Sequence, residues 1–289
     1  MDYLGIIEIG IIFSLFVLGM ILSFRLLGFA DLTIEGSFTT GGAIFAILLS
    51  NGINPFLSIL ISIIGGGVAG LLTASLHCYA GINKLLSGII TLTMLYTANL
   101  RIMGRSNIYI EQTSVLNYIN EPWYEFFVLL IIGVAIFILI KFFLSTNFGL
   151  YLRATGENES FVKNLKSNPK KFIIVGLIIS NSLIALSGCL FAQYVGYSDI
   201  GNGNGMLVSM LTAMIIGENI VRPTTLNRQI ISAIIGAISF QFLYSSALQL
   251  GVKPIDLKIM IGILLIAFLI LTKYGYKGKQ SKNIGANFI

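Results

Sequence analysis

The sequence predicts an all-α integral membrane protein, and three observations lead to this fold class. Hydrophobic residues make up 56% of the 289 residues, and charged residues only 10%. The apolar side chains thus exceed what one soluble core could hide, so the excess must face lipid. The apolar residues are also grouped into long runs, and a helix needs roughly 20 of them to cross the hydrocarbon layer. We expect residues 1–289 to form a single transmembrane domain.

Nine hydrophobic runs predict about nine transmembrane helices. The first Lys or Arg is Arg25, so the first run lacks the basic start of a cleaved leader and is expected to remain as a helix. The second run is short and opens with acidic residues, and the seventh is barely as long as the hydrocarbon layer is thick. The expected spans are residues 5–28, 33–50, 55–79, 84–103, 123–144, 171–195, 206–221, 229–250 and 257–273.

The basic residues predict the orientation. If the tail 274–289 is cytoplasmic, nine spans place the N-terminus outside, with fourteen Lys and Arg inside and four outside. A re-entrant hairpin at 206–221 would instead export the lysine-rich tail, so a short crossing is preferred. We expect a bacterial inner-membrane protein whose net charge of +6 follows from topology, with no nucleic-acid partner. The inner set is Arg25, Lys84, Lys141, Arg153, Lys163, Lys166, Lys170, Lys171, Arg222, Arg228, Lys273, Lys277, Lys279 and Lys282, and the outer set is Arg101, Arg105, Lys253 and Lys258.

The residue types that catalysis needs are not grouped in this sequence. His77 is the only histidine, and Cys78 beside it points to another face of a helix, so no metal site is expected. No GxxxxGK(S/T) loop is present to hold nucleotide phosphates. Cys78 and Cys189 lie far apart in apolar surroundings, which predicts buried packing residues. We expect neither an enzyme nor a cofactor, so active transport would draw its energy from an ion gradient or from another polypeptide.

Polar residues within the spans are candidates for a transport pathway, because lipid penalises them. Asp31 and Glu35 lie four residues apart at the start of the second span, on one helical face. Two alternatives remain open. A helix break would let Glu35 line a water-filled cavity, whereas an unbroken helix would leave both acids in the cytoplasmic headgroup zone. We expect the second, fourth and sixth spans to line the path, through Glu35, Asn99 and Gln193.

A further acid, Glu218, lies at the cytoplasmic end of the seventh span. Arg222 follows one helical turn later, so an ion pair between the two is the simpler expectation. Glu218 and Glu35 are also the acids that an ion-driven transporter would need inside the membrane.

The segment 145–171 is a polar island between two hydrophobic spans, and we expect it to form a cytoplasmic coupling loop. Within it, residues 157–165 predict a short helix that begins near Thr155 and is stopped by Pro169. An apolar edge of this kind fits a groove on a partner protein. The alternative, a helix lying on lipid, is disfavoured by two acidic residues. The residues of the apolar edge are Phe161, Val162 and Leu165.

Four stretches carry a resemblance to a known family: residues 28–38, 82–104, 153–158 and 180–218. Together they resemble permeases of ATP-binding cassette (ABC) importers of the branched-chain amino acid and ribose type, over about residues 15–272, and especially the tryptophan and tyrosine uptake systems of low-GC bacteria. One departure is that Lys166-Ser167-Asn168 follow Leu165, where relatives usually continue Gly-Val/Ile-Asn. The family's Thr-Gly-x-Asn coupling segment carries over to Thr155, Gly156, Glu157 and Asn158.

The resemblance implies a permease subunit that supplies the path and contains no motor. It implies a homodimer in membrane lipid, with a cytosolic ABC ATPase bound at each coupling loop and an extracytoplasmic solute-binding protein that delivers the substrate. Amino acids, and aromatic ones foremost, are the implied substrates. The alternative function is a secondary transporter driven by a proton or sodium gradient.

Overall fold

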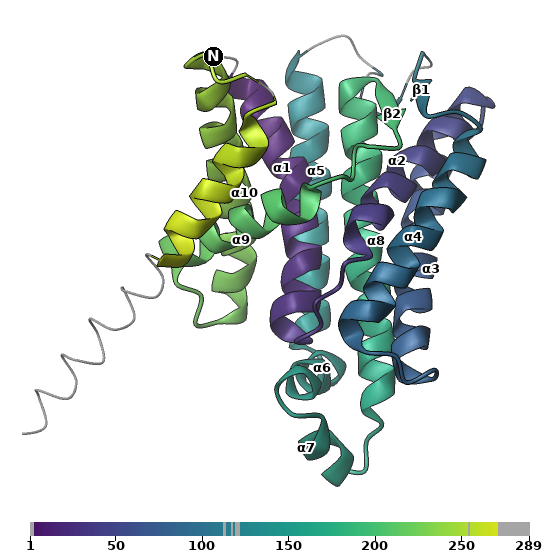
Figure 1. The fold of residues 1–289 in the computed structure, drawn as a ribbon, viewed down its shortest axis with the longest axis vertical. Helices are drawn as coiled ribbons and strands as arrows, with labels where there is room; N and C mark the ends of the chain where they lie inside the picture. The colour runs from purple at the N-terminus through teal and green to yellow at the C-terminus, as the bar shows by residue number, and fades with distance from the viewer. Residues whose placement is uncertain (1–2, 112–113, 117, 119–121, 254, 271–289) are drawn as a thin grey trace, which may run out of the picture.

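The structure is a computed structural model that describes residues 3–111, 114–116, 118, 122–253 and 255–270. These residues are mostly helical (Figure 1). The predicted tail 274–289 lies outside the described residues. The elements are α1 (Tyr3–Met20), the π-helix η1 (Ile21–Leu26), α2 (Ile34–Ser50), α3 (Pro55–Cys78), α4 (Lys84–Met103), β1 (Asn107–Tyr109), α5 (Pro122–Ser145), α6 (Asn147–Glu157), α7 (Glu159–Asn164), α8 (Pro169–Val195), β2 (Tyr197–Asp199), α9 (Met206–Val221), α10 (Leu226–Gln249) and a last helix, Leu257–Ile270.

Six helices among the described residues are long and apolar enough to cross a membrane: α1 with η1, α3, α4, α5, α8 and α10. Three shorter apolar helices, α2, α9 and Leu257–Ile270, coincide with the second, seventh and ninth predicted spans. The all-α, multi-pass architecture is thus confirmed in its coarse form. The count of nine crossings and the orientation of the termini stay predictions.

Local sequence signals explain where two of the spanning helices begin. Asn54 accepts a hydrogen bond from Phe56 N at 2.9 Å, and Pro55 follows at the first helical position. Asn83 accepts one from Leu85 N at 2.9 Å and begins α4 in the same way. Asparagine is a favoured N-cap and proline lacks the amide that the first turn leaves unpaired, so both helices start where the sequence predicts.

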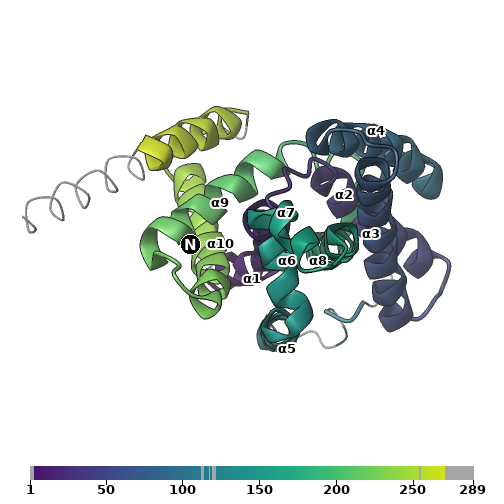
Figure 2. The ribbon, with the colours of Figure 1, turned by 90° about the horizontal axis from the view of Figure 1, so that it is seen from below.

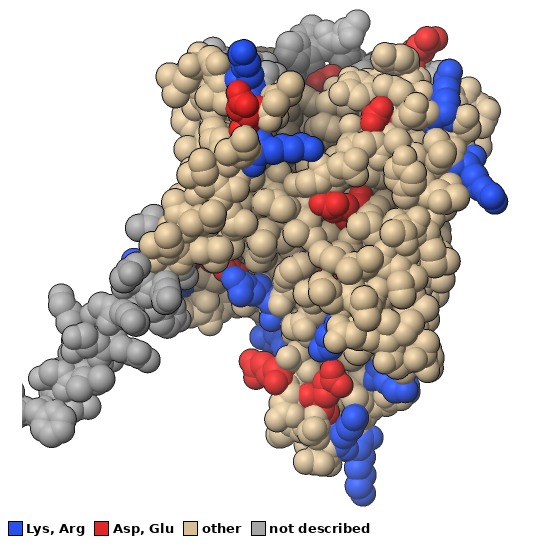
Figure 3. All heavy atoms as spheres, viewed as in Figure 1, with Lys and Arg blue, Asp and Glu red and all other residues tan. Residues whose placement is uncertain are grey.

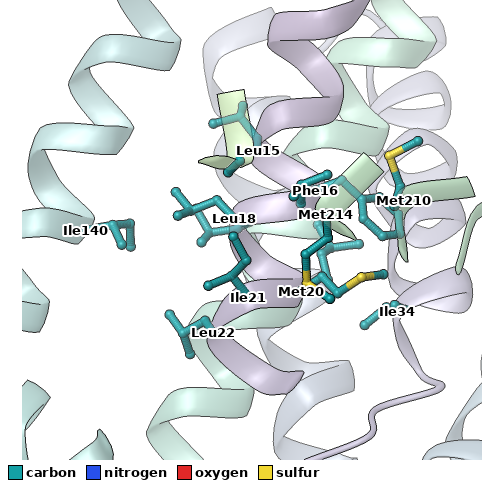
Figure 4. Close-up of a cluster of buried hydrophobic side chains, with 14 of the residues drawn as sticks. Leu15, Phe16, Leu18, Met20, Ile21, Leu22, Ile34, Ile140, Met210 and Met214 are labelled. Atoms are coloured by element: carbon teal, nitrogen blue, oxygen red, sulfur yellow. The ribbon is translucent and has the colours of Figure 1, made fainter. Parts of the chain in front are cut away.

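α1 and α8 form the centre of the bundle. In the most apolar window of each helix, 83% of the α1 residues and 72% of the α8 residues are buried, against 28% for α4 and 22% for α5. Seen from below, α9, α10 and the last helix lie on one side of α1, and α2, α3 and α4 lie on the other side of α8 (Figure 2). Figure 4 shows side chains of α1 packed with Ile140 of α5 and with Met210 and Met214 of α9. The molecule therefore has two lobes joined by a buried pair of helices.

The first interruption of a span lies between η1 and α2. Non-helical chain runs from Leu27 to the start of α2 at Ile34. Gly28 has φ +58°, and a Cβ atom there would also lie 3.1 Å from the carbonyl oxygen of Gly156. α2 then begins beside the middle of α8, where Ser37 donates to Asn181 at 2.6 Å. Of the two alternatives for Asp31 and Glu35, the structure has the helix break.

The second interruption lies between α8 and α9. The chain leaves α8 at Gly196, which has φ +78°, and forms β2, a strand that the all-α expectation did not include. β2 pairs antiparallel with β1, and Ile108, which is buried, lies opposite Ser198. A glycine-rich segment, 200–205, then leads to α9 beside the start of α2. Two short helices, α2 and α9, thus begin next to each other inside the bundle.

Candidate functional site

A polar network lies at the first interruption, completely buried in the chain. Asp31 accepts hydrogen bonds from Thr33 N at 2.9 Å and from Asn181 Nδ2 at 2.8 Å. Asn181 in turn accepts from Ser37 Oγ, while the hydroxyls of Thr33 and Thr73 lie 2.6 Å apart. These five side chains are 0% exposed. They tie the non-helical segment to α2, α3 and α8 at once.

Glu35, in the first turn of α2, holds the start of α9. Its Oε1 accepts hydrogen bonds from Gly205 N at 3.0 Å and from Leu207 N at 3.1 Å. The first amides of a helix have no partner within it and carry partial positive charge, so a carboxylate there is stabilising. α9 has no side-chain cap from its own preceding residue, which is Gly205 with φ +84°. The second interruption thus takes its cap from the first.

Asn99 connects α4 to α2 and is buried, with 1% of its surface exposed. Its Oδ1 accepts from Thr40 Oγ1 at 2.9 Å, and its Nδ2 donates to the carbonyl oxygen of Gly36 at 3.3 Å. In this conformation Asn99 pairs two helices and does not face an open path.

Gln193 lies near the end of α8 and is also buried. Its Nε2 is 3.5 Å from Sγ of Cys189, one turn earlier. Its Oε1 has no hydrogen-bond partner among the described residues. Among the described residues no hydrogen bond joins the side chains of the three predicted pathway residues: Glu35 is partly exposed, Asn99 is buried against Gly36 and Thr40, and Gln193 is buried on α8. Their assignment to the pathway stays a prediction.

The expected ion pair between Glu218 and Arg222 is wrong. Glu218 binds Arg25 in a two-pronged pair, with Nε to Oε1 at 2.7 Å and Nη2 to Oε2 at 2.6 Å. α9 ends at Val221, and Arg222 has φ +51°, so Arg222 does not continue the helical face on which Glu218 lies. The pair instead joins the end of η1 to the end of α9.

The polar island forms two helices where one was predicted. Thr146 accepts a hydrogen bond from Gly149 N at 3.3 Å and caps α6, which runs on through Thr155 and Gly156 to Glu157. Asn158 then caps α7 by accepting from Phe161 N at 3.1 Å. The short helix therefore begins at Glu159, because Asn158 provides the stronger cap. Pro169 does not stop it: α7 ends at Asn164, and Pro169 is the first residue of α8.

The apolar edge of this segment also differs from the prediction. Val162 is completely buried, whereas Phe161 is 53% exposed and Leu165 is 49% exposed. Figure 1 places α6 and α7 at the lower end of the molecule, below α1 and α5 and beside the start of α8. The surface open to a partner is therefore made by Phe161 and Leu165, and Val162 holds α7 against the bundle.

The polar island packs against the first interruption. A Cβ atom on Gly156 would lie 2.0 Å from the carbonyl oxygen of Leu26, so only glycine allows this approach. Lys84 adds a bridge: its Nζ lies 3.4 Å from Gly28 O and 3.5 Å from Glu159 Oε1. Sequence reasoning used Lys84 and Arg25 only as topology markers and missed both contacts, since their partners are distant in the chain.

His77 and the two cysteines have structural surroundings. His77 Nδ1 lies 2.8 Å from Ile82 O, and its ring meets Phe29 edge-on. Cys78 and Cys189 are both buried. Within the described part of the chain, no group of three His, Cys, Asp or Glu residues could hold a metal ion.

Comparison with known proteins gives one consistent assignment. Residues 3–269 match the family model described as branched-chain amino acid transport system / permease component. The chain is 39% identical to a tyrosine transport system permease protein of Clostridioides difficile, over 92% of this chain and 90% of the relative. It is 34% identical to an uncharacterised protein of Rickettsia prowazekii, over 86% of this chain and 90% of that one. It is 25% identical to a fructose import permease protein of Bifidobacterium longum, over 77% and 64% of the two chains. No solved structure matches. The chain belongs to the permease family of branched-chain amino acid transport systems.

Proposed function

We propose that this chain is the membrane permease subunit of an ATP-driven ABC importer for amino acids, with aromatic amino acids such as tyrosine foremost. The observation that carries the proposal is the α6–α7 segment, which offers exposed Phe161 and Leu165 at one end of the bundle and contacts the first interruption on its inner side. The substrate class is supported by the name of the Clostridioides difficile relative, a tyrosine transport system permease protein.

In this proposal a cytosolic ATPase binds the exposed edge of α7. A short helix with two large apolar side chains open to solvent fits a hydrophobic groove on a partner. The Thr155–Asn158 stretch serves a different purpose from the docking edge. Thr155 is buried and Gly156 packs against the carbonyl oxygen of Leu26, so this stretch holds the segment against the permease.

A displacement of the α6–α7 segment would be transmitted to the interior of the bundle through three successive contacts. Gly156 touches Leu26, and Lys84 bridges Glu159 to Gly28. Asp31, three residues after Gly28, is bonded to Asn181, and Glu35 follows at the start of α2. A displacement of α7 would therefore move the non-helical chain and, with it, the two helix starts that meet at Glu35.

The partners and the orientation belong to the same proposal. The permease acts as a homodimer in the bacterial inner membrane, receives substrate from an extracytoplasmic solute-binding protein, and keeps α6 and α7 in the cytoplasm with the N-terminus outside. The charge distribution supports the membrane location: Figure 3 shows charged side chains mostly toward the two ends of the molecule, with few in the broad band between them. Such a band suits a hydrocarbon layer.

The pathway in this proposal passes Glu35, which is partly exposed between the two lobes. Asn99 and Gln193 are enclosed in the present conformation, so they join the path when α4 or α3 moves away from α2 and α8. The ion-driven alternative draws no support from Glu218, which is paired with Arg25.

The function is tested by uptake of labelled tyrosine into proteoliposomes that contain the permease, its ATPase and its binding protein. We expect uptake that requires ATP, and we expect Phe161→Asp to abolish both uptake and ATPase copurification while the permease stays folded. Val162 is unsuitable as a target because it is buried, whereas Leu150, also exposed and apolar but on α6, provides a matched control as Leu150→Asp. Uptake that persists without the ATPase, or that follows an ion gradient, would contradict the proposal.

The orientation is tested by labelling with a membrane-impermeant thiol reagent in intact cells. Ser106 and Ser160 are exposed and lie toward opposite ends of the chain's fold, and both native cysteines are buried. We expect Ser106→Cys to be labelled and Ser160→Cys to be protected. The reverse pattern would overturn the proposed orientation.

A further inference from the structure

Two charged side chains of opposite sign lie at one glycine between the lobes and do not pair with each other. Glu35 Oε1 is 3.0 Å from the backbone nitrogen of Gly205. A Cβ atom placed on the same glycine would lie 4.0 Å from Nζ of Lys258. No ion pair joins Glu35 to Lys258 among the described residues, where the pairs are those of Arg25 with Glu218 and Lys84 with Glu159.

Glu35 retains an open oxygen. Its Oε1 already accepts both amides at the start of α9, but its Oε2 accepts no hydrogen bond from the described residues. The helix terminus is thus occupied, and what remains available is the carboxylate itself. Glu35 is two residues before Ser37, which bonds Asn181 near the middle of α8, so the start of α2 lies deep in the bundle. An ionisable group at such a depth is costly to keep without a function.

Lys258 is positioned from the other lobe. Its neighbour Leu257 is buried and Ile261, one turn later, is also buried, so they fix this helix against the bundle. Lys258 itself is exposed and has no hydrogen-bond or ion-pair partner among the described residues. The carboxylate comes from the α2 lobe and the ammonium from the lobe of α9, α10 and the last helix (Figure 2).

We propose that Glu35 and Lys258 form a subsite for the two charged groups of a zwitterionic α-amino acid. Glu35 accepts hydrogen bonds from the substrate ammonium, and Lys258 donates to the substrate carboxylate. A ligand with both charges on one carbon reaches both side chains, and it supplies an opposite charge to two groups that have no ion-pair partner among the described residues. The subsite binds the α-ammonium and α-carboxylate groups that all amino acids share, and other contacts select the substrate side chain. The inference rests on the proposed function for its substrate class.

The subsite also spans the two lobes. A substrate held by both charges links the start of α2 and α9 to the last helix, so its release follows when the lobes separate. The coupling contacts at Gly156 and Lys84 act on the chain between η1 and α2, which leads to Glu35. ATP-driven motion of the segment would therefore change the distance between the two substrate-binding charges.

The test measures binding of three probes to the purified permease–ATPase complex in nanodiscs, without the binding protein. The probes are L-tyrosine, tyramine, which lacks the carboxylate, and 4-hydroxyphenylpropionate, which lacks the ammonium. We expect the wild type to bind L-tyrosine about tenfold or more tightly than either analogue, which corresponds to one charge-assisted contact for each missing group.

The variants assign each contact to a residue. Lys258→Met should remove the preference for L-tyrosine over tyramine and keep the preference over 4-hydroxyphenylpropionate. Glu35→Gln should do the opposite, and its amide oxygen can still accept the two amides of α9. Lys253→Met and Asp256→Asn are the matched controls, since both residues are exposed at the same end of the last helix. Both controls should behave like the wild type.

Two results would overturn the subsite. One is equal affinity of the wild type for the three probes, or no binding of any at millimolar concentration. The other is a Lys258→Met variant that discriminates as the wild type does, and this exposed side chain can be changed without loss of the fold. ATP-dependent uptake by the wild-type complex reports on the proposed function separately. ATP-dependent uptake together with equal affinity for the three probes would contradict the subsite alone. Absence of ATP-dependent uptake would contradict the proposed function.

Discussion

The two interruptions of the bundle have the same form but are stabilised in different ways. At the first, between η1 and α2, the non-helical chain carries its own polar side chains, and Asp31 is bonded to Thr33 and Asn181. At the second, before α9, glycines occupy every second position from Gly201 to Gly205 and supply no side chain. The cap of α9 comes from Glu35 of the first. Side-chain hydrogen bonds to α3 and α8 thus hold the first interruption, whereas the second has a local side-chain bond, from Gly201 N to Asp199, and depends on Glu35 for the cap of α9.

The largest expected effect is at Asp31, where the comparison predicts that the first interruption fails as a unit. Asp31→Ala leaves Thr33 N and one amide hydrogen of Asn181 buried without an acceptor, while the other Asn181 hydrogen still bonds Leu177 O. Each unpaired buried donor costs about 1–3 kcal/mol, so we expect a loss of roughly 2–6 kcal/mol in the free energy of unfolding. The measurement is denaturant titration in mixed micelles. Asp31→Asn keeps one acceptor and should lose less stability. An Asp31→Ala variant as stable as the wild type would show that the hydrogen bonds of Asp31 do not stabilise the first interruption.

A smaller effect is expected at Gly203, which probes how tightly the second interruption rests on the first. A Cβ atom there would lie 2.2 Å from Glu35 O and 2.5 Å from Thr39 Oγ1. We expect Gly203→Ala to cost about 1–3 kcal/mol, as overpacking does. Gly262→Ala is the matched control, because nothing lies within 4 Å of its added methyl group. Equal stability of the two variants would mean that the segment 200–205 is free to move away.

Removing the shared cap should have an intermediate effect that depends on the residue introduced. Glu35→Ala removes the acceptor for Gly205 N and Leu207 N, and we expect a loss of about 0.5–2 kcal/mol, as for other N-caps. Glu35→Gln should retain most of this stability. In Glu35→Ala, amide hydrogen exchange should become faster in the first turn of α9, while the exchange rates in α2 stay unchanged. Faster exchange at Asp31 and Thr33 instead would reverse the proposed dependence.

The smallest effect is expected at the ion pair between Arg25, at the end of η1, and Glu218, at the end of α9. Arg25 is 49% exposed and Glu218 is 21% exposed, so solvent screens their pair and its contribution is about 0–1 kcal/mol. We expect Arg25→Met to change the unfolding midpoint only slightly, and the difference from wild type to shrink further at high salt. A loss of unfolding free energy as large as that of Asp31→Ala would show that η1 and α9 are joined mainly by this ion pair at their ends.

The sequence was sufficient where a boundary depends on neighbouring residues. Asn54 with Pro55, and Asn83, set the starts of α3 and α4, and both predicted starts agree with the structure. The predicted helix start near Thr155 was wrong, because Thr146 and Asn158 each cap a helix of their own and Thr155 lies inside the first of these. Both signals are local, and the packing of Gly156 on Leu26 favours the longer α6.

The candidate site was predictable in its residue types and not in its partners. Glu35 stood out as an acid within a span, but its contacts lie 170 and 172 positions later in the chain. Lys258 was read only as an outer positive charge. Nothing in a single sequence indicates that helix Leu257–Ile270 returns to Gly205, since that placement follows from tertiary packing.

The borrowed cap of α9 has a consequence for how the chain is made. Glu35 leaves the ribosome about 170 residues before the amides of Gly205 and Leu207 exist. Until they arrive, its carboxylate has neither of its two amide donors, so it must remain in contact with water or the insertion machinery, or else bind a proton. The early helices therefore either leave the place of α9 open to water or to the insertion machinery, or hold Glu35 protonated, until the last third of the protein is inserted. Glu35 then accepts the two amides and caps α9.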